Sequence, residues 1–222
     1  MYQDIIKDMR TRCRMGMNGV ASTSMRQRGL DYKVNFGLSI QQIKELASRY
    51  DANAELAETL WKENTRELKI LATHLYPVDA FTREKADEWV KAIPNQEIRE
   101  QACANLFQNL AFATEAATTW SNNPNSEVRA TGYWLLARLL LTKKADSALR
   151  PESLSLIWED VISEDTFLRN AALLALKQIG RQAENTANDI LHRLSIYKDD
   201  PDPMKQEIYN AMDFEFDYFF NK

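Results

Sequence analysis

The sequence predicts an all-α protein, an α-solenoid of stacked antiparallel helix pairs, because one helical pattern recurs along the chain. Residues 95–106 read NQEIREQACANL, residues 126–136 read SEVRATGYWLL and residues 164–174 read EDTFLRNAALL. Each copy begins with polar residues and continues with an arginine among small and apolar residues at helical spacing. These arginines, Arg99, Arg129 and Arg169, stand 30 and 40 residues apart, and a looser copy at 64–75 places Arg66 33 residues before Arg99. Such self-similarity is typical of stacked helix pairs.

Composition agrees with a helical protein in water. The 222 residues are 45% hydrophobic and 27% charged, with only six glycines and six prolines, which favours long helices with short connections. No apolar run is long enough for a membrane span and no leader peptide is recognisable, so we expect a cytoplasmic location. Cys13 and Cys103 stand alone, and His74 and His192 lack ligand spacing, so we expect neither a disulfide nor a metal site.

The charges are distributed unevenly. The formal net charge is −4, yet residues 1–50 contain nine lysines and arginines against four acids, so the remainder of the chain is strongly acidic. A basic face that binds an anionic partner produces this asymmetry, and so do ordinary solvated helix surfaces. The acidic carboxyl-terminal segment also contains Phe214, Phe216, Phe219 and Phe220. Exposing all four would be costly, so we expect this helix to dock on the repeats.

Capping residues and apolar spacing predict where the helices begin and end. Ser39 is expected to cap one helix, either Asp51 or Asn53 the next, and either Asn64 or Thr65 the one after that. Pro151 is expected to open another helix at its first turn, where the missing N–H costs nothing. The predicted helices cover 1–14, 21–27, 40–50, a helix after 53, 66–76, 82–93, 97–113, 115–120, 126–141, one from 151, 165–181, 185–197 and 204–220.

A loop bracketed by glycines, GLDYKVNFG at 29–37, interrupts the helices, and we expect Tyr32 and Phe36 to point inward from it. The five tryptophans are spaced as core anchors. Each recurring arginine has two interpretations: it braces the neighbouring repeat through an acid or a loop carbonyl, or it contributes to a positive stripe that contacts phosphates. No glycine-rich phosphate loop or nucleophile elbow occurs, which disfavours the enzyme classes that need them.

Several stretches together resemble a known family. They are the basic amino-terminal region leading into NFGLSIQQIKELASRY (35–50), the segment ELAETLWKENTRELKILATHL (55–75) and the repeats after residue 95. In these features the chain resembles the DNA alkylation repair family of AlkD-like DNA glycosylases, built from HEAT-like repeats. The resemblance covers about residues 22–196, and its most specific piece is the LxxxLWxxxxREL segment. It implies a basic groove for duplex DNA and excision of cationic N3- or N7-alkylated purines without a metal or cofactor.

The resemblance also nominates site residues. The family's acidic motif, Trp-Asp-x-x-Asp, aligns with residues 96–100, so Glu100 and Glu97 are the candidate catalytic carboxylates and Gln96 replaces the tryptophan. A second family tryptophan aligns with Leu174, and a tyrosine aligns with Ser24. The phosphate-contacting arginine falls beside Arg129, where a shift of one residue would put Ala130 in its place. The candidate DNA contacts are Arg26, Arg28, Lys33, Arg99, Arg129 and Arg169.

We expect a single α-solenoid domain over residues 1–222. It would consist of basic amino-terminal helices (1–50), HEAT-like repeats (51–198) and an acidic capping helix (199–222). The expected function is binding of double-stranded DNA by a monomer, with N-glycosylase activity as its catalytic form. The alternative is a non-catalytic scaffold that holds DNA or a protein partner in its concave groove. Salt dependence discriminates the two, because phosphate contacts weaken steeply with salt and an apolar protein interface does not.

Overall fold

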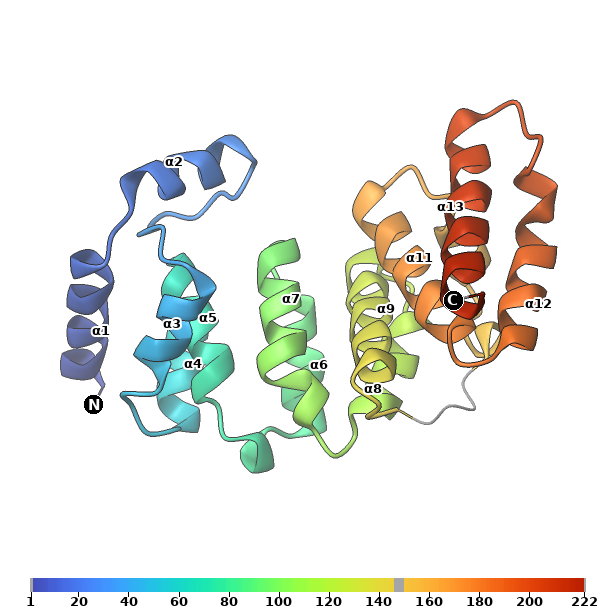
Figure 1. The fold of residues 1–222 in the computed structure, drawn as a ribbon. Helices are drawn as coiled ribbons and strands as arrows, with labels where there is room; N and C mark the ends of the chain where they lie inside the picture. The colour runs from blue at the N-terminus through green and yellow to red at the C-terminus, as the bar shows by residue number, and fades with distance from the viewer. Residues whose placement is uncertain (1, 146–149, 222) are drawn as a thin grey trace. The chain divides into compact units, whose positions relative to one another are not determined.

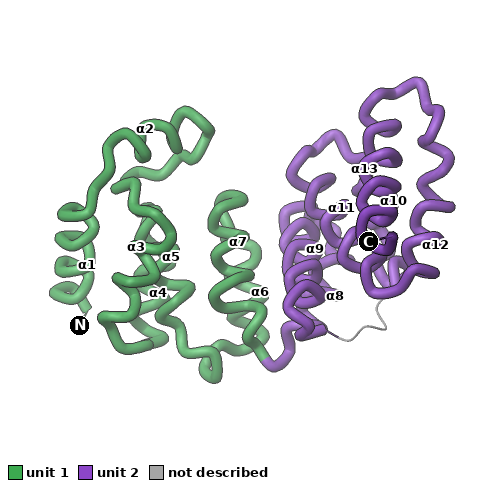
Figure 2. Tube along the Cα trace, viewed as in Figure 1, with its two compact units in different colours: residues 1–110 green, residues 111–222 purple. Residues whose placement is uncertain are grey.

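A computed structural model describes residues 2–145 and 150–221 of the chain. Within them the protein is all-α, with thirteen α-helices, short 3-10 turns and one isolated bridge between Val34 and Thr65 (Figure 1). No helix of this described part is both long and apolar enough to cross a membrane. The chain divides into two compact units, Met1–Leu110 and Ala111–Lys222 (Figure 2).

Unit 1 is built around α5, which contacts α1, α3, α4 and α7. An aromatic cluster fills its interior: the rings of Trp61 and Trp89 stack with centroids 4.0 Å apart, and Tyr76 and Phe81 meet Trp89 edge-on. In Figure 1, α2 runs across the ends of α3 and α5 rather than alongside them. The helices are α1 (Gln3–Met15), α2 (Gly19–Gln27), α3 (Ile40–Ala47), α4 (Ala54–Lys62), α5 (Arg66–Leu75), α6 (Arg83–Lys91) and α7 (Gln96–Asn105).

Unit 2 is built around α9 and α11, which pack along each other. Small residues allow close approach: a Cβ on Gly132 of α9 would lie 2.3 Å from the backbone nitrogen of Ser121 at the end of α8. The last helix, α13, packs on α11 and α12. The helices are α8 (Ala113–Ser121), α9 (Ser126–Leu141), α10 (Ile157–Asp160), α11 (Thr166–Gly180), α12 (Glu184–Leu194) and α13 (Pro203–Phe220).

Several sequence predictions about these elements are confirmed. Ser39 caps α3, accepting a hydrogen bond from the backbone N–H of Gln42, and Asn53 caps α4 in the same way. Tyr32 and Phe36 are buried, as are Trp61, Trp89 and Trp120. Trp134 and Trp158 are only half-buried, and the Trp158 ring lies under the guanidinium of Arg193.

Two predicted helices are wrong in extent. The helix expected over 97–113 ends at Asn105, where the side chains of Gln108 and Asn109 donate to backbone carbonyls of the last helical turn and replace the helical N–H donors. The helix expected from Pro151 is a single 3-10 turn, Pro151–Ser153, followed by the four-residue α10. There the Asn122 side-chain oxygen accepts hydrogen bonds from the backbone N–H and the hydroxyl of Ser155, and these bonds hold residues 154–156, between the 3-10 turn and α10, out of a helix.

The four phenylalanines of α13 are not all covered. Phe216 is buried against Gly180 of α11, and Phe220 is half-buried. The helix docks as expected, since it packs on α11 and α12, but Phe214 is 71% exposed and Phe219 is 45% exposed. The difference arises because α13 presents only one side to α11 and α12.

Candidate nucleic-acid interface

Three of the predicted DNA contacts lie on one short segment of unit 1. Arg26 belongs to the last turn of α2, Arg28 follows its end, and Lys33 lies in the loop that leads to α3. All three side chains are exposed. We call residues 26–38 the basic loop, and its position depends on a cluster of buried charges beneath it.

Glu67 anchors the basic loop from below. Its side chain is fully buried and accepts hydrogen bonds from three consecutive backbone N–H groups, those of Phe36 (3.1 Å), Gly37 (3.0 Å) and Leu38 (3.3 Å). Gly37 has φ +74°, and a Cβ there would lie 2.2 Å from the carbonyl oxygen of Asn18. Only glycine fits this tight turn without strain, so the backbone N–H groups converge on the carboxylate.

Arg66 connects this carboxylate to α7. Its guanidinium donates to the Leu38 carbonyl (2.7 Å), to Glu67 (3.0 Å) and to both carboxylate oxygens of Glu97, the latter at 2.7 to 3.0 Å. Burial alone would lower the pKa of Arg66, but the hydrogen bonds to Glu97 and Glu67 outweigh it and raise the pKa. The buried cation is therefore shared between two carboxylates, as the energetics of buried charge require.

The basic loop also contacts the beginnings of α5 and α7 directly. The Tyr32 hydroxyl lies 3.2 Å from the Asn95 side-chain oxygen and 3.3 Å from a Glu97 oxygen. The backbone N–H of Val34 donates to the Asn64 carbonyl, and its carbonyl accepts from the N–H of Arg66. The loop is thus tied to the helices beneath it at several points between residues 32 and 38.

The two candidate catalytic acids differ in their surroundings. Glu97 is engaged by Arg66 and by Tyr32, and its side chain is 18% exposed. Glu100 is half-buried one turn further along α7 and accepts a hydrogen bond from the Gln96 amide at 3.0 Å. The Gln96 oxygen in turn accepts from Arg99 at 2.6 Å. Glu100 is therefore held by a neutral amide, whereas the charge of Glu97 is balanced by a guanidinium.

The recurring arginines make contacts of the bracing kind. Arg129 forms a bidentate ion pair with Asp160 of α10 and donates to the Asn123 and Pro124 carbonyls, and Tyr133 donates to the same aspartate at 2.8 Å. Arg169 donates to the Ser163 carbonyl six residues before it, just as Arg129 does to Asn123.

Arg99 is 2% exposed, so its guanidinium is not at the surface, and we do not assign it to the interface. Arg129 and Arg169 are half-buried and engaged by these contacts.

Comparison with known proteins shows which family the chain belongs to. A profile described as "DNA alkylation repair enzyme" matches residues 18–205. The chain belongs to this DNA alkylation repair family. It is also similar in structure, with a TM-score of 0.72 and 15% sequence identity over 94% of both chains, to a protein described as one of "a new family of proteins related to the HEAT-like repeat DNA glycosylases with affinity for branched DNA structures". This likeness confirms the predicted all-α solenoid of HEAT-like helix pairs. Curated proteins give no match.

Sequence reasoning missed the anchoring pair of the basic loop in this family member. Arg66 and Glu67 are the first two residues of REL in the LxxxLWxxxxREL segment, the most specific part of the family resemblance. That motif was therefore the one signal in the sequence that could have pointed to them. The motif did not reveal their role, because a Glu that follows an Arg at a helix start is usually solvated. Only the fold shows that a loop about 30 residues earlier in the chain returns to it.

Proposed function

We propose that the protein binds double-stranded DNA and that Arg26, Arg28 and Lys33 contact its phosphates. One observation carries the proposal: three exposed cations lie within eight residues, at the end of α2 and in the loop after it, and Glu67, Arg66 and Tyr32 tie down that loop at residues 32–38. Cations on a fixed loop lose little conformational freedom when they meet a phosphate, and charge-assisted hydrogen bonds to phosphate are strong. Family membership supports the proposal, and so does the described affinity of the structural neighbour for branched DNA.

The test is a titration of duplex DNA with a variant that neutralises the loop. Arg26→Gln, Arg28→Gln and Lys33→Gln together should weaken binding about 10-fold or more at low salt. The matched control changes three exposed lysines outside the loop, Lys62, Lys91 and Lys198, to glutamine, so the net charge falls equally. An equal loss of DNA affinity in both variants would mean that binding depends on net charge alone and not on the basic loop. No binding of wild type to DNA would favour the alternative, a scaffold for a protein partner.

Base excision is a second candidate function, and Glu100 is the carboxylate that favours it. A carboxylate stabilises the cationic sugar that forms as an alkylated purine leaves, and it does so best when no cation already neutralises it. Glu100 meets this condition better than Glu97, which is paired with Arg66. Release of free base from duplex DNA containing an N3- or N7-alkylated purine should then vanish in Glu100→Gln, while DNA binding persists. Undiminished base release in Glu100→Gln, or none in wild type, would remove this candidate.

A further inference from the structure

Large apolar side chains that are exposed to solvent gather at two places in the described chain. One is the amino-terminal part of unit 1, where α1, α3 and the start of α2 expose Ile5, Met15, Met17, Val20 and Ile40. The other is α13 in unit 2, which exposes Phe214, Tyr218 and Phe219. Contiguous exposed apolar surface on a protein in water marks a site that a partner covers. The roles proposed above use neither surface.

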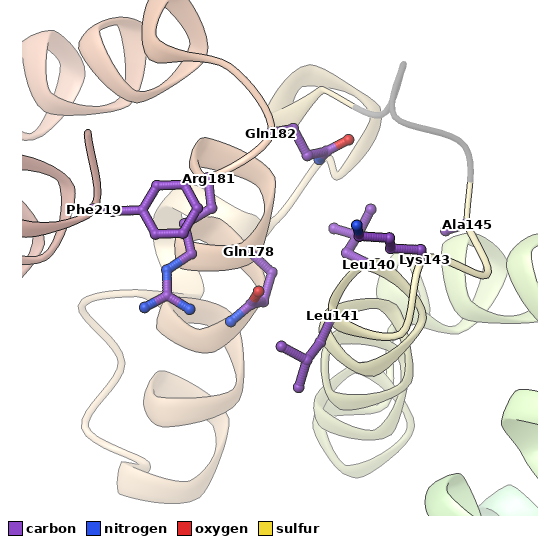
Figure 3. Close-up of a pocket in the computed structure, with 8 residues that line it drawn as sticks. All are labelled: Leu140, Leu141, Lys143, Ala145, Gln178, Arg181, Gln182 and Phe219. Carbon is purple, nitrogen blue, oxygen red and sulfur yellow. The ribbon is translucent and has the colours of Figure 1, made fainter. Parts of the chain in front are cut away.

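Two aromatic rings of α13 point away from the rest of unit 2. Phe214 is 71% exposed, and its ring stacks with that of Tyr218, one helical turn further on, with centroids 6.2 Å apart. The side of α13 that is buried against α11 and α12 includes Phe216 instead. Phe219 also belongs to that inner side, because the guanidinium carbon of Arg181 lies 4.9 Å from its ring centroid (Figure 3).

Negative charge surrounds this aromatic pair. Exposed acids flank it along the same helix, namely Glu207, Asp213 and Asp217. Within Pro203–Phe220 the one cation is Lys205, which is half-buried and lies 3.8 Å from Asp200. We call Glu207, Asp213, Phe214, Asp217 and Tyr218 the α13 face. Two α13 faces would repel each other, so this face is suited to a surface that is both apolar and basic.

Unit 1 contains a groove with an apolar floor between α1 and α3. Its volume is about 300 Å³, and Met15, Leu38 and Leu46 line it. Leu38 and Leu46 are buried beneath it, whereas Met15 is 83% exposed at its side. A cavity of about 150 Å³ can hold a benzene ring, so this groove, which we call the α1–α3 groove, has room for one aromatic side chain.

The rim of the α1–α3 groove is charged. It includes Arg12 of α1 and Arg49, which follows the end of α3, and both are exposed. Arg12 is bonded to Asp8 at 2.8 Å. Glu45 also lies at the rim, where a neighbouring glutamine donates a hydrogen bond to it. Residues 1–50 contain nine lysines and arginines against four acids, so the groove lies in a region of net positive charge.

We propose that copies of this chain associate through these unlike surfaces. The α13 face of one copy docks in the α1–α3 groove of another, with Phe214 over the apolar floor and the acids beside it near Arg12 and Arg49. Both the apolar surfaces and the charges are complementary, and an exposed aromatic side chain that enters a groove is a typical interface anchor. Each copy offers both surfaces, so the contact can continue from copy to copy. The proposal is independent of DNA binding and replaces the monomer expected from the sequence.

Sedimentation equilibrium of the full chain without DNA tests the proposal. The mass of wild type should rise with concentration up to about 0.5 mM, a range that reaches the weak affinities of small interfaces. High salt should reverse the rise. Phe214→Ser should lower the association constant about 10-fold or more. The matched control, Phe167→Ser, removes another exposed phenylalanine of unit 2, 62% exposed, and should leave association unchanged.

A second pair of variants tests the groove. Arg49→Glu should lower the association constant as strongly as Phe214→Ser does, whereas Lys62→Glu, which reverses an exposed charge of unit 1 outside the groove, should not. Phe214→Ser and Arg49→Glu, each weakly associating alone, should form a dimer when mixed, because one supplies an intact groove and the other an intact α13 face. Melting temperatures of all variants should match wild type, since the changed side chains are exposed. If Phe214→Ser unfolds, Asp213→Lys is the substitute on the same face.

The outcomes decide between this contact and its alternatives. A wild type that stays monomeric at every concentration overturns the proposal and leaves the α13 face to a different protein or to the same copy. Association that persists in Phe214→Ser or in Arg49→Glu shows that copies meet through other surfaces, and it also overturns the proposal. Equal losses in the two control variants would do the same, because they would show that any exposed ring or charge matters equally. Recovery of the dimer in the mixture supports the contact between unlike surfaces directly.

Discussion

At the scale of single residues, the most consequential group is the buried carboxylate of Glu67. It has no exposed surface, and it accepts bonds from three backbone N–H groups and from Arg66. Much of the anchoring of the basic loop therefore depends on this one side chain. Its role could not be predicted from the sequence, because no local pattern shows that a carboxylate at the start of one helix contacts the backbone of a distant loop.

Glu67→Ala should lower the free energy of unfolding by about 3–5 kcal/mol, because it leaves Arg66 with one carboxylate fewer and removes the acceptor of the Phe36 and Leu38 N–H groups, whereas Gly37 keeps the Asn35 side chain as an acceptor. Urea denaturation measures the change. Glu164→Ala, which removes an exposed carboxylate in unit 2, should change stability by less than about 0.5 kcal/mol. A loss in Glu67→Ala no larger than in this control would contradict the anchoring role.

Cys13 gives a second prediction at this scale. Burial raises the pKa of its thiol to about 12, with the nearby charge of Glu67 acting in the same direction. Since the thiolate is the reactive form and a raised pKa makes it scarce, Cys13 should not react with a thiol reagent at pH 8 in the folded protein. Both cysteines should react after denaturation. Rapid labelling of Cys13 before unfolding would show that α1 opens readily.

At the scale of elements, the sequence predicts helix starts better than helix ends. Side chains such as Ser39, Asn53 and Asn125 cap their helices through bonds to nearby N–H groups, so the signal lies within a few residues. The end of α7 depends instead on Gln108 and Asn109, amides that fit a helix interior equally well when nothing competes. The apolar pattern continues through this break, and for that reason the sequence predicts one helix where the structure has a helix and a 3-10 turn.

The packing of α13 against α11 can be tested by a substitution at Gly180. A Cβ at this position would lie 2.3 Å from the ring of Phe216, so Gly180→Ala should destabilise the protein by about 1–3 kcal/mol through overpacking. Helix propensity alone predicts that Gly180→Ala stabilises the protein, since alanine is more favourable than glycine in a helix by about 1 kcal/mol. Thermal unfolding decides between them.

Phe216→Leu is the matched partner for this test, because a smaller side chain makes room for the added methyl group. In the Gly180→Ala background it should recover part of the lost stability, although alone it costs some. A stabilised Gly180→Ala protein would mean that α13 does not press on α11 at this point.

At the scale of the whole molecule, charge asymmetry predicted a basic region, and the structure places part of it on one anchored loop. Arg26, Arg28 and Lys33 are exposed as the interface requires, whereas Arg99 is buried and Arg129 is paired with Asp160. Sequence could not separate the two groups, because the partner that engages an arginine can lie far along the chain, as Asp160 does from Arg129.

The measurement that tests the central claim most directly is the salt dependence of duplex DNA binding, compared between wild type and the variant with Arg26, Arg28 and Lys33 changed to glutamine. Each phosphate neutralised by the protein adds about 0.9 to the steepness with which log K falls as log salt concentration rises. We predict a steep slope for wild type, and a slope in the variant that is shallower by about 0.9 for each phosphate that these three side chains neutralise. A wild-type slope near zero, or an equal slope in the two proteins, would contradict the assignment of the basic loop to DNA.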